Sequence, residues 1–170
     1  RSKLTPVLIS RPDGFPGADF IVRLRPAPDL SGFVTVERQA SQQNRDSEGQ
    51  NQFDQRIVLW RQDREPVVLL TLPAGELSVS KENVQLDAAW MPDGRGIILL
   101  SQYEGKNAAG NEVLLQYSLD DGRIVRGLRL PQRAVTANRI AVRPGTESSS
   151  LLVATLDKTG GASEWELHGE

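Results

Sequence analysis

The chain has 170 residues, of which 38% are hydrophobic and 25% are charged, and its formal net charge is -2. This is the composition of an ordinary globular domain that can bury a sizeable core. A charge so close to zero creates no field that attracts nucleic acid or an anionic membrane, so we expect neither as a partner. The absence of cysteine excludes disulfides, thiolate nucleophiles and cysteine zinc sites. No apolar run is long enough to span a membrane.

Short apolar runs rich in β-branched residues recur along the chain, each bounded by Gly, Pro, Asp, Asn or Ser. Such runs are typical of buried or half-buried strands. They lie at 33–36, 57–60, 67–70, 97–100, 113–115 and 151–153. Asp-Gly pairs, as at Asp93-Gly94 and Asp121-Gly122, separate several of them, and this dipeptide favours tight turns. The sequence therefore predicts an all-β fold.

The strand pattern repeats, and we expect one domain, 1–170, made of three units at about 19–73, 84–131 and 137–170. Each unit begins with an apolar residue, any residue and a proline, at Leu24-Arg25-Pro26, Trp90-Met91-Pro92 and Val142-Arg143-Pro144. The first two units continue with a second pair of strands, so the unit contains about four antiparallel strands. The aromatic residues of the third strands are expected to take equivalent core positions, namely Trp60, Tyr117 and Trp165.

The last unit stops after its third strand. The apolar segment 4–9 belongs to no first strand, and it is the right kind of segment to supply the missing one.

One turn carries a family resemblance. The segment 88–101, with Trp90-Met91-Pro92-Asp93-Gly94 at its centre, resembles the repeat of TolB-like and related WD40-like β-propellers, in which Met91 replaces the usual serine. The resemblance implies four-stranded propeller blades. Three blades do not close a ring, so we expect an incomplete ring or half of a dimeric propeller. A β-sandwich is the alternative.

No residue pattern points to catalysis or to a cofactor. His168 is the only histidine and lies near the end of the chain, so neither a zinc site nor a serine nucleophile with its base is indicated. The acidic turn residues lack the spacing of a calcium loop, and no phosphate-binding loop precedes a helix. We therefore expect no enzymatic activity, no metal and no cofactor.

The polar segment 39–55 is the largest insertion in the repeat. Loops carried by a rigid scaffold often hold binding residues, and Phe53 is the aromatic anchor of this one. Arginines near Trp60 extend the candidate surface, because arginine and tryptophan are enriched at interface hot spots. The expected partner-binding residues are Asn44, Arg45, Gln50, Phe53, Arg61 and Arg64.

These features favour a non-catalytic protein-interaction or assembly module of the propeller type. A propeller that binds or hydrolyses glycans or peptides is one alternative, and a structural fragment of a larger propeller protein is another. A protein partner is expected, and a homodimer or a place in a larger chain or complex would complete the ring. The resemblance to TolB-like repeats also implies an extracytoplasmic, periplasmic location.

Overall fold

The computed structural model describes residues 12–13, 15, 17–45, 51–62, 64–72, 86–103, 111–130, 137–147, 150–157 and 160–168. These residues form eleven strands in three antiparallel sheets, and they contain no helix. The prediction of an all-β fold is confirmed. Accordingly, this part of the chain has no helix long and apolar enough to cross a membrane.

Each sheet is made from strands that follow one another in the sequence. The first sheet contains β1 (Phe20–Pro26), β2 (Gly32–Arg45), β3 (Asn51–Arg61) and β4 (Val67–Leu72). The second contains β5 (Leu86–Trp90), β6 (Gly96–Tyr103), β7 (Asn111–Ser118) and β8 (Arg123–Arg129). The third contains β9 (Ala137–Pro144), β10 (Ser150–Asp157) and β11 (Ala162–His168). Among the described residues no sheet closes on itself, and the predicted closing strand 4–9 lies outside them.

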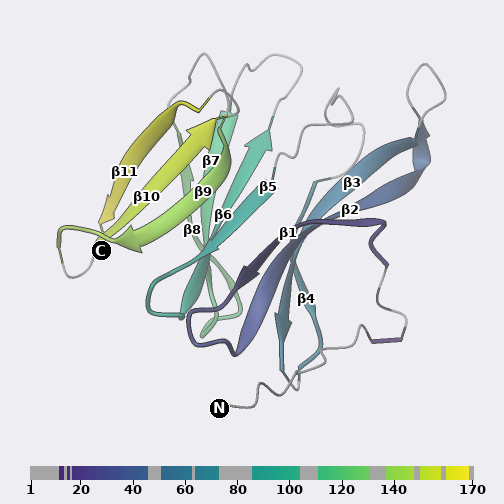
Figure 1. The fold of residues 1–170 in the computed structure, drawn as a ribbon, viewed down its shortest axis with the longest axis horizontal. Coiled ribbons are helices and arrows are strands. Elements are labelled where there is room, and N and C mark those ends of the chain that lie inside the picture. The colour runs from purple at the N-terminus through teal and green to yellow at the C-terminus, as the bar shows by residue number, and fades with distance from the viewer. Residues whose placement is uncertain are drawn as a thin grey trace, which may run out of the picture.

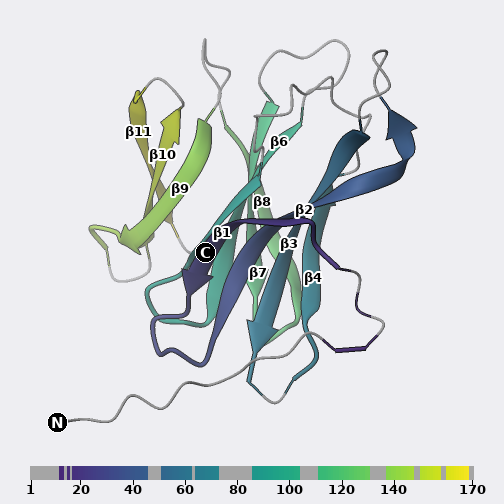
Figure 2. The same ribbon diagram turned by 45° about the vertical axis from the view of Figure 1, so that its right-hand side comes forward.

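The second sheet lies between the other two (Figure 1), and the rotated view in Figure 2 shows the same order. One core fills the space between the first and second sheets, with Val34, Ile57 and Leu99 among its buried side chains. Another lies between the second and third sheets and includes Leu100 and Val153. The first strands of the three sheets are neighbours, because β5 contacts both β1 and β9.

The turn between the first two strands repeats closely in the first two sheets. Residues 28–32 (PDLSG) and 92–96 (PDGRG) occupy the same places. In both turns the aspartate side chain accepts a hydrogen bond from the backbone N–H two residues later, at 3.0 Å in the first and 2.9 Å in the second. The third turn position has a positive φ in each, 61° at Leu30 and 71° at Gly94. The predicted equivalence of Pro26 and Pro92 is therefore wrong by two residues, and Pro28 corresponds to Pro92.

The third strands keep the same register in all three sheets, but only the first two have an aromatic residue at the equivalent position. Trp60 lies opposite Phe33, and Tyr117 lies opposite Ile97, one residue beyond the glycine that ends each turn. A Cβ atom at Gly32 or Gly96 would collide with the carbonyl oxygen of that aromatic residue. In the third sheet Leu167 takes this position. The predicted equivalence of Trp165 is wrong, because Trp165 lies one pleat period away.

Candidate functional site

Asp87 ties the first strands of all three sheets together. Its side chain is fully buried. Its carboxylate lies 3.4 Å from Nη1 of Arg23 and accepts hydrogen bonds from Nη2 of Arg25 at 3.2 and 3.4 Å. From the other side, the backbone N–H of Ile140 donates to the same carboxylate at 2.9 Å. A buried carboxylate needs such partners because burial removes its hydration.

Two more arginines lie near the pair of arginines that contacts Asp87. Arg38 and Arg139 are close enough to Arg23 to act on it electrostatically. Burial lowers the pKa of Arg23, Asp87 raises it again, and Arg139, Arg25 and Arg38 lower it further. Burial also lowers the pKa of Arg38. Arginine stays protonated despite such shifts, so each of these four side chains carries a positive charge.

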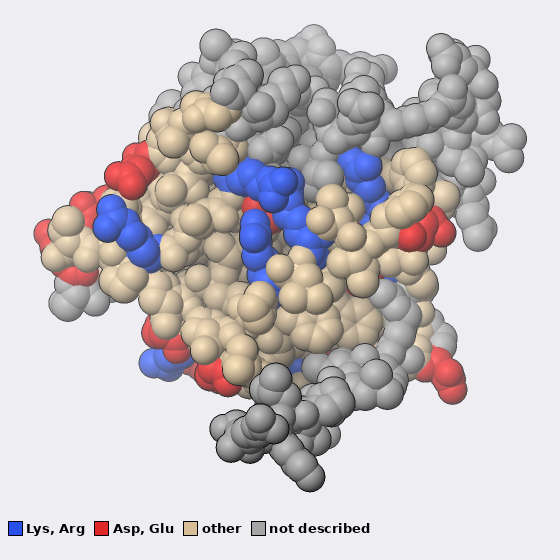
Figure 3. Space-filling view, in the orientation of Figure 1, with Lys and Arg blue, Asp and Glu red and all other residues tan. Residues whose placement is uncertain are grey.

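Exposure differs among the arginines. The side chain of Arg23 is 6% exposed, whereas that of Arg25 is 36% exposed. Arg139, which directly precedes Ile140 on β9, is exposed as well. The arginine cluster is therefore buried at Arg23 and accessible to solvent at Arg25 and Arg139. Figure 3 shows lysine and arginine atoms gathered around a small acidic area in the middle of one face.

An aromatic pair lies on the same face of the first sheet. The ring of Phe20 on β1 meets the ring of Phe53 on β3 edge to face, with centroids 5.9 Å apart. Phe20 lies opposite Arg38, and Arg23 lies opposite Val36, two residues along β2. The register shift between Ile21 and Arg23 puts Phe20 and Arg23 on one face of the sheet, as bulges do when they re-aim a side chain.

We call this set of residues the junction surface. It consists of Phe20, Arg23, Arg25, Arg38, Phe53, Asp87 and Arg139. Phe20 is 57% exposed, and aromatic and arginine side chains side by side are the commonest anchors of protein interfaces.

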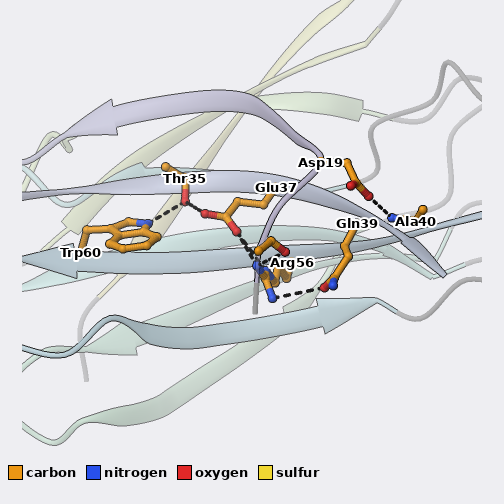
Figure 4. Close-up of polar contacts among 8 residues, drawn as sticks. Asp19, Thr35, Glu37, Gln39, Ala40, Arg56 and Trp60 are labelled. Atoms are coloured by element: carbon orange, nitrogen blue, oxygen red, sulfur yellow. Dashed lines mark hydrogen bonds and ion pairs between the residues drawn. The ribbon is translucent and has the colours of Figure 1, made fainter. Parts of the chain in front are cut away.

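A second polar network lies on the opposite face of the first sheet (Figure 4). Trp60 donates to Thr35 at 2.9 Å, and Thr35 donates to Glu37 at 2.8 Å. Arg56 donates to the other oxygen of Glu37 at 3.0 and 2.8 Å. Glu37 is fully buried and Arg56 is 7% exposed. Because its charges are paired and hidden, this network is suited to holding the sheet together rather than to binding.

Among the six residues predicted from the sequence, the structure separates Phe53 from Arg61 and Arg64. Phe53 is half-buried beside Phe20, whereas Arg61 and Arg64 lie at the opposite end of β3, near the turn to β4. Eight residues of extended strand separate Phe53 from Arg61, which is about 26 Å. Asn44 and Arg45 belong to β2, with side chains outside the described part of the structure, and Gln50 lies outside it altogether.

Sequence reasoning did not single out Asp87, Phe20, Arg38 or Arg139. One signal was present, because Arg23 and Asp87 occupy equivalent positions on the first strands of adjacent units. Arg23 and Arg25 also alternate along β1, which places both side chains on one face of the strand. Opposite charges at equivalent positions of neighbouring repeats are the sequence pattern that predicts this contact between the first strands.

Compared with known proteins, the chain matches no protein-family model, no curated protein and no solved structure.

Proposed function

We propose that this chain is a non-catalytic protein-interaction module built from propeller-type units, and that it binds its partner through the junction surface. The exposed Phe20, held against Phe53 beside the arginine cluster, is the observation that carries the proposal. Phe20 leaves 57% of its side chain exposed although Phe53 packs against it, and aromatic side chains are enriched at protein interfaces. Next to arginines, it has the chemistry of an interface anchor.

Three features support the propeller-type arrangement. Each sheet follows a meander in which neighbouring strands pair in chain order. The first two sheets share one turn structure, and the three first strands lie together. Propeller blades stack their sheets in this way around the first strands.

Completion of a ring by a second copy is less well supported. The first sheet packs on the second through a face that includes Ile57, and the second packs on the third through a face that includes Leu114. The equivalent position of the third sheet holds Glu164. Glu164 forms an exposed ion pair with Arg143 at 3.6 Å. The outward face of the third sheet therefore combines this ion pair with apolar side chains such as Leu156, which is 41% exposed.

The alternative of a hydrolytic enzyme has less support than a binding role. The junction holds a single carboxylate, Asp87, and its oxygens already accept bonds from arginine and from a backbone N–H. Glycoside hydrolysis commonly uses two carboxylates.

Affinity capture from an extract of the source cells, with wild-type protein and two variants, tests the proposal. Phe20→Ser should lose the captured partner. Ile124→Ser is the matched control, because Ile124 is 41% exposed on β8, away from the junction surface. Thermal unfolding checks that both variants fold. Retention of the same partner by Phe20→Ser would place the interface elsewhere.

A further inference from the structure

We propose that the third sheet binds a second copy of this chain through its outer face, the face that points away from the second sheet. This inference goes beyond the proposed function and does not rest on it, because Phe20 and Phe53 belong to the first sheet. It follows from the distribution of charged and apolar side chains over three neighbouring strands.

One face of the third sheet is covered and the other is open. Ile140, Val153 and Leu167 belong to the core between the second and third sheets. Successive side chains of a strand point to opposite faces, so the residues next to them in the sequence form the outer face. The outer face consists of Arg139, Ala141 and Arg143 on β9, Leu152, Ala154 and Leu156 on β10, and Glu164 and Glu166 on β11, all exposed or half-buried. In Figure 1 this sheet lies at one end of the stack of sheets.

Opposite charges lie on opposite sides of the outer face. Its arginines are on β9 and its glutamates are on β11. The strand between them, β10, contributes two leucines with an alanine in the middle. In the register of the sheet, Arg143 and Glu166 lie on either side of Leu152. An apolar stripe therefore separates a positive side of the outer face from a negative side.

A two-fold axis along β10 makes the outer face complementary to itself. Rotation about this axis keeps the strand direction and exchanges the two sides, so β9 of one copy faces β11 of the other. Arg143 then lies over Glu166 of the partner subunit, twice in each dimer, and Leu156 lies over its own counterpart on the axis. A two-fold axis across the strands would instead place β9 over β9, with arginine facing arginine. Because like charges in an interface are costly, the charges select the axis along β10.

The charged groups of the outer face can take a second partner. Nη2 of Arg143 lies 3.6 Å from Oε1 of Glu164, and the two side chains are 69% and 58% exposed. An exposed pair of this kind contributes little to stability, so Arg143 can turn towards a second carboxylate at little cost. Glu166 accepts hydrogen bonds from Thr146 and Ser150 through Oε1, and the described residues leave its Oε2 for a guanidinium of the partner subunit.

The outer face is small, so the dimer should be weak. Three strands at a spacing of about 4.8 Å, with seven residues of about 3.3 Å each, give a footprint of about 14 Å by 23 Å. Interfaces of this size belong to transient complexes. Both copies use the same face, so association stops at two copies and does not close a ring.

Analytical ultracentrifugation of the purified chain, at about 10 µM to about 1 mM, tests this inference. We expect a reversible dimer whose association weakens with added salt, because its ion pairs lie near solvent. Arg143→Glu should lower the association constant by about tenfold or more, since each dimer loses two ion pairs and gains two repulsions. Arg123→Glu is the matched control, because it makes the same change of charge at an exposed arginine on β8.

Single cysteines test the direction of the axis, because the chain has no cysteine of its own. In the proposed dimer the two copies of Leu156 face each other across packed sheets, which are about 10 Å apart. A short bismaleimide should therefore link two molecules of Leu156→Cys. Ile124→Cys is the matched control, since Ile124 and Leu156 are each 41% exposed but Ile124 lies on β8. Thermal unfolding checks that all of these variants keep the fold.

Three results would overturn the proposal. The first is a chain that stays monomeric up to about 1 mM. The second is a dimer that Arg143→Glu and Arg123→Glu weaken equally, because the contact would then depend on the charge of the whole chain. The third is a dimer in which Leu156→Cys is linked no better than Ile124→Cys, which would place the contact on another face. None of these results bears on capture of a partner through Phe20, so the proposed function is tested separately.

Discussion

Replacement of Asp87 by asparagine tests whether this residue joins the three sheets. The change keeps the shape of the side chain and one acceptor oxygen for the N–H of Ile140. It removes the negative charge that faces Arg23, whose side chain is 6% exposed. The buried guanidinium of Arg23 would then lose its ion pair with Asp87.

The expected cost is large. Loss of one partner from a buried ion pair typically costs about 3 to 5 kcal/mol, against a total stability of about 5 to 15 kcal/mol for a typical domain. Asp120→Asn is the matched control, because the Arg95–Asp120 pair is 72% and 60% exposed. Such a surface pair contributes about 0 to 1 kcal/mol. Asp87→Asn should therefore be the more damaging change by several-fold.

Urea unfolding followed by tryptophan fluorescence measures both variants. Trp90 is a useful reporter, since its indole N–H donates to the backbone oxygen of Arg25 at 2.9 Å. With a urea dependence of about 2 kcal/mol per molar, Asp87→Asn should lower the midpoint by about 2 M, and Asp120→Asn by less than about 0.5 M. Equal small shifts for the two variants would refute the role of Asp87 as a buried counterion.

Two further predictions concern a turn and a carboxylate. Gly94→Ala should destabilise the fold by about 1 kcal/mol, because a Cβ atom there meets nothing within 4 Å and only the positive φ opposes it. Leu30→Gly changes the equivalent position of the other turn, and it should raise the melting temperature if the relief of backbone strain exceeds the added entropy of the unfolded chain. A melting temperature unchanged by Gly94→Ala would contradict the left-handed turn. The pKa of Glu166 is lowered to about 2, first by the hydroxyl of Thr146 and then by that of Ser150. The stability that this carboxylate contributes is present above its unfolded pKa and is lost as the pH falls from about 4.5 towards 2. In Glu166→Gln the free energy of unfolding should therefore depend less on pH over this range than in the wild type. An unchanged dependence on pH would refute the lowered pKa of Glu166.

The sequence by itself determined the local structure of this protein. Short runs of β-branched residues bounded by turn residues predicted strands, and the six predicted runs lie within β2, β3, β4, β6, β7 and β10. Asp-Gly turns were equally readable, and Gly94 and Gly122 both have a positive φ. These properties depend on a residue and its nearest neighbours, so they can be read without knowledge of the rest of the fold.

Turn chemistry was readable only in part. Leu30 has the same left-handed backbone as Gly94, yet leucine gives no sign of it in the sequence. The surrounding hydrogen bonds of the turn impose that conformation. Alignment on the nearer proline, Pro26, therefore missed the true repeat.

The junction surface was decided only by the tertiary structure. Arg25 and Asp87 are 62 residues apart, and their contact exists because the first strands of two sheets pack together. Alternation along a strand shows that it has two faces, but it does not show what covers each face. The same limit hid the buried pair of Glu37 and Arg56, which the sequence presents as ordinary surface charges. Which charges are buried and which remain open to a partner depends on how the sheets stack, because burial is a property of the assembled faces and not of the residue.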